Sequence, residues 1–270
     1  GDITSKKSIM KIKNLSILVY WSLTIFSIIF ILIPTSLKAT NIKNSAVVFM
    51  YHKFGISKYP STSVTLEQFE SHLEELSKPK YNVKSIDYII DTIINDASLP
   101  PNTIGITVDD ADRSFFDVAW PLLKKSGFPV VLFVTTNTIS NNKNYLTWDE
   151  IRLLKNEGVV IGAHSHSHSH FPNLTFEKIK DEIETSNKVF LKELEEIPDL
   201  FAYPYGETDE KFMQLLKDYK FKVAFGQHSG VINETSNLYY LPRFSLNEKY
   251  GNIKRVQFAA NSKGLGIYDF

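Results

Sequence analysis

The chain has 270 residues with a composition typical of a globular protein, and its 30 basic and 30 acidic residues give a formal net charge of zero. The balanced charge gives no electrostatic reason to expect nucleic acid or an acidic polymer as a partner. Because the chain has no cysteine, disulfides and thiolate catalysis are excluded, and any metal site must use histidine and carboxylate ligands.

The N-terminal segment predicts export. Residues 15–33 are uncharged and almost entirely apolar, and several lysines precede them. With a candidate cleavage site after Ala39 this pattern is typical of a signal peptide, but the apolar run is also just long enough to span a bilayer. We therefore expect 1–39 to be a signal peptide or a membrane anchor, the only part in contact with a membrane. Residues 40–45 would be a linker, and 46–270 one domain on the periplasmic or extracellular side.

Strands and helices are predicted to alternate along this domain. The apolar runs predict strands at 46–50, 83–86, 104–108, 130–134, 159–163, 199–203, 221–225 and 239–241. The helical patterns predict helices at 65–76, 87–95, 115–126, 147–158, 175–195 and 208–218. Capping boxes mark the starts at Thr65 and Thr147, whereas the tail after Gly251 has no strong pattern.

This alternation is the signature of a parallel α/β domain. About eight strands without a repeat or an internal boundary predict a single (β/α) barrel-like domain, a distorted barrel of seven or eight strands. The alternative is an open doubly wound sheet, but no glycine-rich phosphate loop follows the first strand.

The stretch 104–111, Ile-Gly-Ile-Thr-Val-Asp-Asp-Ala, is an apolar strand that ends in Asp109 and Asp110. Buried strands do not tolerate unpaired charge, so this pair is expected where the strand leaves the core. Neighbouring residues on a strand point in different directions, which favours one acid on a metal and the other on a proton. The alternative is a simple Asx-type turn.

Other polar side chains also follow predicted strands. They are His52, His164, Tyr205, His228 and Arg243. In a parallel barrel the carboxyl ends of all strands share one face, where such folds keep their active sites. We therefore expect these residues to converge with the two aspartates.

Four histidines alternate in Gly162-Ala-His164-Ser-His166-Ser-His168-Ser-His170. His164 and His168 are four apart, as are His166 and His170, so the spacing alone does not choose a pair. Two imidazoles with one carboxylate make a catalytic rather than a structural metal site, and they suit zinc and other late divalent ions. A polar loop with incidental histidines and a nonspecific metal-binding tract are the alternatives.

Three segments resemble motifs of the polysaccharide deacetylase family, the NodB-homology group or carbohydrate esterase family 4. Thr107-Val-Asp109-Asp110-Ala resembles T-F-D-D-G, and His164-Ser-x-x-His168 resembles H-(S/T)-x-x-H. Phe201-Ala-Tyr-Pro-Tyr205-Gly resembles R-x-P-Y-G. The resemblance runs from 46 to 243, with the motifs in family order.

The resemblance implies hydrolysis of N-acetyl groups on a glycan. It assigns a divalent metal, zinc first with cobalt or nickel as alternatives, to Asp110, His164 and His168. It makes Asp109 the general base and places a backbone N–H near Tyr205 at the oxyanion.

The sequence also departs from the family pattern. Ala111 stands where the family has glycine, and Ala202 stands where it has the arginine that orients the catalytic aspartate. Arg243 is the candidate replacement. The family's late motifs, one of which carries the general acid, are not evident, so His228 and His52 are the candidates for that acid.

Two other functions compete with a deacetylase. A non-catalytic carbohydrate-binding relative is motivated by the missing arginine and late motifs. A glycosidase is disfavoured, because its two carboxyl groups flank the scissile bond about 5–10 Å apart, whereas Asp109 and Asp110 are adjacent in the chain. The sequence does not identify the sugar.

Overall fold

The structure is a computed structural model, and it describes residues 44–262. The predicted signal or anchor at 1–39 lies outside the described residues. Within 44–262, no helix is long and apolar enough to cross a membrane.

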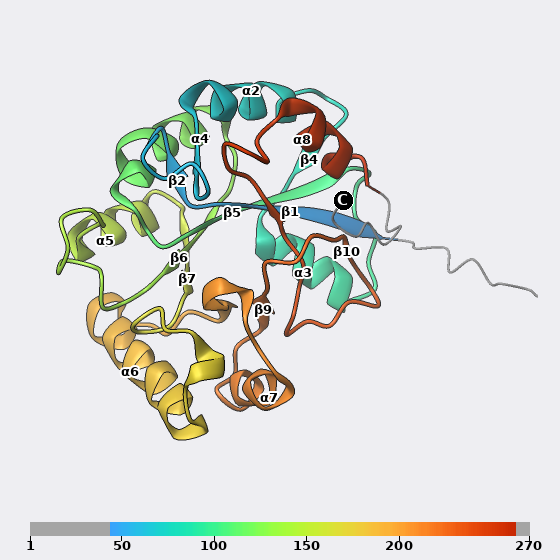
Figure 1. The fold of residues 1–270 in the computed structure, drawn as a ribbon. Coiled ribbons are helices and arrows are strands. Elements are labelled where there is room, and N and C mark those ends of the chain that lie inside the picture. The colour runs from blue at the N-terminus through green and yellow to red at the C-terminus, as the bar shows by residue number, and fades with distance from the viewer. Residues whose placement is uncertain (1–43, 263–270) are drawn as a thin grey trace, which may run out of the picture. The chain divides into compact units, whose positions relative to one another are not determined.

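The centre of the fold is a curled sheet in the strand order β10-β1-β5-β6-β7-β8-β9 (Figure 1). All strands of this path except β10 run parallel to their neighbours. The bounds are β1 (Ser45–Tyr51), β5 (Thr103–Asp109), β6 (Val131–Val134), β7 (Val160–Ala163), β8 (Leu200–Ala202), β9 (Val223–Phe225) and β10 (Ile232–Asn233). Short strands β4 (Asn82–Val83) and β11 (Phe244–Ser245) pair with β5 and β1, and β2 (Lys53–Phe54) pairs with β3 (Ser63–Val64).

The segment after β9 connects the two ends of the parallel run. Leu241 forms a parallel bridge with Phe225 of β9, and Phe244 of β11 pairs with Phe49 of β1. The chain therefore crosses from the last parallel strand back to the first. This confirms the predicted barrel-like α/β fold, in which polar residues at the strand ends meet on one face.

The helices lie around this sheet (Figure 1). They are α2 (Leu66–Leu76), α3 (Ile86–Ile94), α4 (Trp120–Ser126), α5 (Trp148–Asn156), α6 (Phe176–Leu194), α7 (Glu210–Asp218) and α8 (Ile253–Ala260). The predicted capping boxes are present at Thr65 of α2 and Thr147 of α5. Each box satisfies two backbone N–H groups at the start of its helix, which explains why these starts were predictable.

Two hydrophobic cores lie on the two faces of the sheet. Along β1, Val47 and Phe49 join the larger core, and Val48 between them joins the smaller one, as the alternation of a strand requires. The smaller core includes the apolar side of α3. Gly105 makes this packing possible, because a Cβ there would lie 2.5 Å from Cδ1 of Ile86.

Several predicted elements differ in detail. The predicted helix at 115–126 begins as a π-helix, Phe115–Ala119, and becomes α4 only at Trp120. Pro121, which has no N–H to donate, explains the irregular ladder at this junction. Asp209 rather than Thr208 caps α7, since its carboxylate accepts the N–H of Phe212 at 2.8 Å.

At the C-terminal end, α8 forms where no pattern was recognised, with Asn252 accepting the N–H of Lys254 at 2.8 Å. The predicted strand at 239–241 is only a single bridge at Leu241, and the ladder with β1 lies further on, in β11.

Candidate active site

Asp109 and Arg243 form a bidentate ion pair in which neither side chain is exposed. The distances from Nη1 to Oδ1 and from Nη2 to Oδ2 are 2.7 and 2.8 Å. Arg243 also donates to Oγ1 of Thr107 at 3.1 Å and to the carbonyl of Gly226 at 2.9 Å. Asp109 is the last residue of β5, at the end of the strand as expected, but it is fully buried because Arg243 pairs its charge.

The electrostatics of this pair keep Asp109 ionised. Burial alone raises the pKa of the Asp109 carboxyl, but Arg243, followed by His164 and His52, lowers that pKa below its ordinary value. A guanidinium matches a carboxylate with two parallel hydrogen bonds, so it also fixes the orientation of Asp109.

Asp110, His164 and His168 gather their ligand atoms within 4.8 Å of one another. Nε2 of His164 and Nε2 of His168 lie 3.4 and 3.3 Å from Oδ1 of Asp110. Oδ1 of Asp110 and Nε2 of His164 are buried without a hydrogen-bond partner, a costly arrangement for polar atoms. Two imidazoles, a carboxylate and two orphaned buried atoms fit a divalent cation with open coordination positions.

Charge in this cluster supports the same interpretation. Burial raises the pKa of Asp110, but the close approach of the His164 and His168 imidazoles outweighs it and holds that pKa well below the usual value. Asp110 is thus a carboxylate at neutral pH, as a metal ligand must be.

The second motif supplies the imidazoles through a tight turn. Ser165 and His168 both have positive φ, +65° and +58°, and Oγ of Ser165 accepts the N–H of His168 at 3.0 Å. Nδ1 of His164 lies 2.7 Å from the carbonyl of Ala202, which can only accept. In the neutral ring Nδ1 must therefore carry the proton, and the lone pair of Nε2 is left for a ligand.

The two other histidines of the run point elsewhere. Nδ1 of His166 lies 2.9 Å from Oγ1 of Thr136. His170 lies 3.1 Å from Glu207 and stacks on the ring of Tyr205 at 3.6 Å. The structure thus brings His164 and His168 to Asp110, a choice that spacing alone left open.

The turn after β5 separates the two aspartates. Asp110 and Ala111 have positive φ of +78° and +57°, a conformation that costs roughly 1–2 kcal/mol for each L-residue. The N–H of Leu146 holds this turn by donating to the carbonyl of Ala111 at 3.2 Å. Asp109 therefore points into the core toward Arg243, and Asp110 points to the histidines.

Tyr205 lies at the edge of the same cluster. It has φ of +59°, its side chain is exposed, and its ring centroid lies 4.6 Å from that of His168. The third motif therefore borders the metal-ligand cluster through Tyr205, although its arginine position is occupied by Ala202.

The two candidate acids lie in different places. Nε2 of His52 is 4.0 Å from Oδ2 of Asp109, and burial lowers the pKa of His52 despite the two nearby aspartates. His228 is exposed and packs on the ring of Tyr240 at 4.3 Å. Between these two histidines, it is His52 that lies within ion-pair distance of Asp109.

Sequence reasoning did not single out Thr107 as a site residue. Its hydroxyl donates to the carbonyl of Phe49 at 2.9 Å and accepts from Arg243. The signal was available, because Thr107 is the first residue of the Thr-x-Asp-Asp motif.

Comparisons with known proteins give a consistent picture. Residues 96–224 match the family model described as polysaccharide deacetylase. The chain is 24% identical over 196 residues to the putative polysaccharide deacetylase YxkH of Bacillus subtilis (strain 168), covering 73% of this chain and 69% of that protein. It is also 24% identical over 225 residues to the poly-beta-1,6-N-acetyl-D-glucosamine N-deacetylase of Staphylococcus aureus (strain MRSA252), covering 78% and 76%.

Solved structures share the fold. The Streptococcus pyogenes deacetylase PplD in complex with acetate matches with a TM-score of 0.73 at 18% identity, over 80% of this chain and 98% of that one. IcaB from Ammonifex degensii matches with a TM-score of 0.71 at 19% identity, over 81% and 98%.

Proposed function

Because this chain belongs to the polysaccharide deacetylase family, we propose that it is a metal-dependent hydrolase that removes N-acetyl groups from a cell-surface glycan. The observation that carries this proposal is that two sites with different chemistry lie next to each other. One is the Asp109–Arg243 ion pair, and the other is the cluster of Asp110, His164 and His168.

A divalent cation, when bound, would supply polarisation of the amide carbonyl and activation of the attacking water. Asp110, His164 and His168 would hold it, and zinc suits this donor set, with cobalt or nickel as alternatives. The fixed tautomer of His164 directs its free nitrogen toward the ligand position.

Asp109 takes the proton of the water in this proposal. Arg243 keeps its carboxylate ionised and oriented, which general base catalysis requires. Hydrolysis of the amide then yields acetate and a sugar amine that needs a proton. His52, whose Nε2 lies 4.0 Å from Oδ2 of Asp109, and His228 are the candidates for the donor of this proton.

Other observations support the proposed substrate and location. A relative is named for poly-β-1,6-N-acetyl-D-glucosamine, so this polymer is the first substrate to test. We propose export from the apolar pattern at 15–33, with 1–39 as signal peptide or anchor and 46–270 as the deacetylase domain. Cell fractionation with an antibody against the domain checks the location.

Acetate release from N-acetylglucosamine oligomers, with and without a chelator, tests the proposal. We expect Asp109→Asn to lower turnover by about a hundredfold or more while the protein keeps its metal, because the substitution removes the base but leaves Asp110, His164 and His168 in place. His164→Ala should lose both metal and turnover. Elemental analysis of each purified variant separates the two effects.

His166→Ala is the matched control, because His166 belongs to the same run but contacts Thr136 instead of the cluster. It should keep both metal and activity. Full activity of Asp109→Asn would show that the assigned base is wrong.

A further inference from the structure

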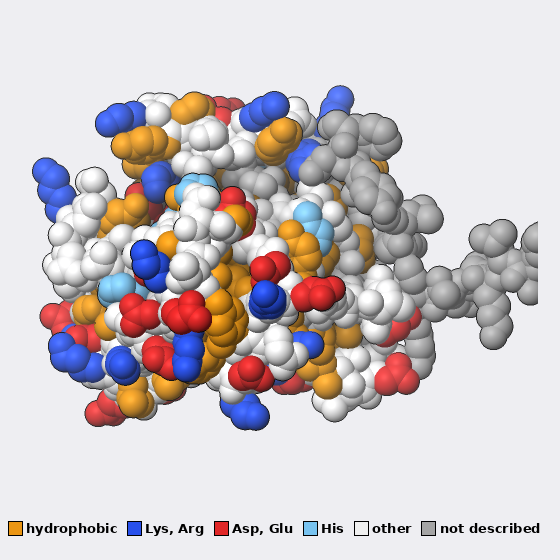
Figure 2. All heavy atoms as spheres, turned by 60° about the horizontal axis from the view of Figure 1, so that its bottom comes forward, with side chains coloured by type: hydrophobic (Ala, Val, Ile, Leu, Met, Phe, Trp, Pro, Cys, Tyr) orange, Lys and Arg blue, Asp and Glu red, His pale blue; other side chains and the backbone are white. Residues whose placement is uncertain are grey.

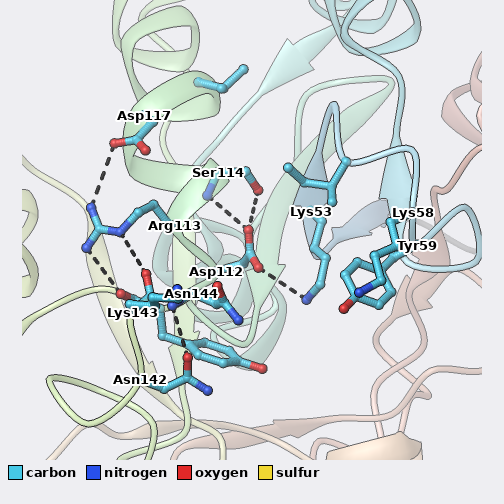
Figure 3. Close-up of a pocket in the computed structure, with 13 residues that line it drawn as sticks. Lys53, Lys58, Tyr59, Asp112, Arg113, Ser114, Asp117, Asn142, Lys143 and Asn144 are labelled. Carbon is cyan, nitrogen blue, oxygen red and sulfur yellow. Dashed lines mark hydrogen bonds and ion pairs between the residues drawn. The ribbon is translucent and has the colours of Figure 1, made fainter.

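Figure 3 shows a cavity, and its volume is about 720 Å³. Its walls come from three loops, which follow β1, β5 and β6 at their carboxyl ends. Lys53 of the wall directly follows His52, and Asp112 is two residues after the metal-ligating Asp110. Two residues of chain span at most about 7 Å, so the cavity borders the site where the N-acetyl group would react.

The wall carries more basic than acidic groups. Four cationic side chains line it, and two acidic ones do. Arg113 is fully engaged, since it forms a bidentate pair with Glu150 at 3.0 and 2.8 Å and lies 3.9 Å from Asp117. Lys58 and Lys143 form none of the ion pairs found among residues 44–262.

The side chain of Lys53 is held in place, but its ammonium group still has hydrogen-bond donors without a partner. Its side chain is 13% exposed, and its Nζ lies 3.4 Å from Oδ2 of Asp112, whose Oδ1 already accepts two hydrogen bonds from Ser114. Figure 3 shows Lys53 and Asp112 pointing toward one another across the cavity wall. An ammonium has three donors, so Lys53 has donors left for a ligand.

Two tyrosines complete the wall. Nζ of Lys53 lies 5.8 Å from the ring centroid of Tyr59 and 5.9 Å from that of Tyr145. Tyrosine offers an apolar face and a hydroxyl, a combination that suits a sugar ring. Burial raises the pKa of Tyr145, Lys53 opposes this rise, and Asp110 adds a smaller rise, which again places this wall beside Asp110.

The overall charge of the protein gives this cavity no preference between charged and neutral glycans. The chain has no net charge, and acidic and basic side chains are interspersed over the face shown in Figure 2. Discrimination between charged and neutral glycans must therefore come from local groups, whose effect falls off within about 10 Å at moderate salt.

We propose that this cavity binds the sugar next to the one being deacetylated and selects a sugar that carries a carboxylate or phosphodiester group, through Lys53 and Lys58. The proposal rests on the proposed deacetylase function. A partly desolvated ammonium with spare donors forms charge-assisted hydrogen bonds with an anion and gains less from a neutral hydroxyl. A neighbouring glucosamine, which is cationic, would be repelled.

Three substrates of equal length test this selection by kcat/KM for acetate release. The first is a neutral N-acetylglucosamine oligomer, the second alternates with N-acetylmuramic acid, and the third carries a phosphodiester. We expect at least one anionic substrate to be preferred about tenfold, with a preference that shrinks as salt is added. Which of the two is preferred identifies the anion as carboxylate or phosphate.

Variants connect the preference to the cavity. Lys53→Gln should lower the anionic-to-neutral ratio about tenfold, and Lys58→Gln, at an exposed position that does not hold the fold together, about threefold. Lys84→Gln is the matched control. Nζ of Lys84 also lies over a tyrosine, 5.6 Å from the ring centroid of Tyr88. The backbone N–H of Lys84 donates to the carbonyl of Ile104, which places Lys84 at the opposite end of β5 from the cavity. Its ratio should equal that of the unchanged protein.

Binding of the same oligomers to metal-loaded Asp109→Asn, measured by calorimetry, separates this proposal from the proposed function. If the unchanged protein released acetate from none of the substrates, the proposed deacetylase function would be contradicted. The affinities of the oligomers for Asp109→Asn would still test the cavity proposal. Equal or weaker binding and turnover with anionic glycans, or ratios unchanged in both lysine variants, would overturn the cavity proposal.

Discussion

The ion pair of Asp109 and Arg243 allows a carboxylate to be buried in this protein. A buried carboxylate is tolerated only when paired, and the guanidinium pairs both of its oxygens. The centroids of Phe133 and Phe225 lie 5.5 and 5.7 Å from the guanidinium carbon. Arg243 thus supplies the guanidinium whose absence from the third motif motivated the non-catalytic alternative.

Arg243→Gln should lower the free energy of unfolding by about 3–5 kcal/mol, because it leaves Asp109 buried without a partner. It should also lower acetate release, since the base loses its orientation. Urea denaturation measures the first effect. The double variant Asp109→Asn, Arg243→Gln should lose less stability than the sum of the single variants.

Arg243→Lys keeps the charge but not the planar fork, so it should recover only part of the stability. A loss below about 1 kcal/mol for Arg243→Gln would mean that the pair does not hold this part of the core.

The sequence predicted these residues better than their conformations. Arg243 was found because it follows a strand end, and Asp109 because it ends an apolar run. The positive φ of Asp110 and Ala111 was not predictable, since the tertiary contacts that impose it, such as the bond from Leu146, come from a distant loop.

At the scale of elements, Glu75 connects α2 with its surroundings. Its side chain is 3% exposed, and its carboxylate accepts from Lys78, from Tyr81 at 2.9 Å and pairs with Lys80 at 3.1 Å. Gln257 of α8 also bonds to it. These groups, Lys78 first, lower the pKa of Glu75 from 4.5 to about 2 against the opposing effect of burial.

A carboxylate with a depressed pKa contributes stability that is present above its unfolded pKa and lost as the pH falls through its folded pKa. Glu75 should therefore contribute fully above about pH 4.5 and lose its contribution between pH 4.5 and 2. Glu75→Gln should lower stability at pH 7 and flatten the acid loss in that window, as thermal unfolding at several pH values would show.

Glu74→Gln is the matched control, because Glu74 is the exposed neighbour on the same helix. An acid profile of Glu75→Gln that coincides with that of the unchanged protein would contradict this role.

Elements whose starts are fixed by contacts between residues close in sequence were predictable. The boxes at Thr65 and Thr147 satisfy helix N–H groups from within the sequence itself, so α2 and α5 start where predicted. β2, β3, β10 and β11 have two residues each, too few for any periodicity, and their pairing depends on the rest of the fold. The helix α8 was missed although Asn252 caps its start, so a local signal for it was present.

For the whole molecule, β11 completes the connection between β9 and β1. Phe244 of β11 is 2% exposed, and its ring lies 6.5 Å from that of Phe49 in β1. The adjacent Arg243 is thereby brought to Asp109. The same segment thus closes the curled sheet and brings Arg243 into the site.

Phe244→Ala should cost about 3–5 kcal/mol of unfolding free energy, because it leaves a cavity in the core. It should also speed hydrogen exchange at 241–246 and reduce acetate release. Phe258→Ala removes the same side chain at a position that is 58% exposed, so it should change stability by less than about 0.5 kcal/mol. Unchanged exchange at 241–246 in Phe244→Ala would contradict the coupling.

Convergence of the strand ends was predictable because the fold class alone places them on one face. The cavity beside the site was not, because loops form its walls and no periodic pattern places Lys53 next to Tyr145. Charge selection by the protein therefore depends on the part of the structure that sequence patterns describe least.

The pair of Asp109 and Arg243 joins residues 134 positions apart in the chain. At typical rates of protein synthesis, between about 7 and 27 s separate the appearance of the two residues. His164 and His168 emerge well before Arg243, so a growing chain has the proposed metal ligands before Arg243 can orient Asp109, the proposed base. Hydrolytic activity thus arrives late in biosynthesis, when the segment that carries Arg243, just before β11, has been made.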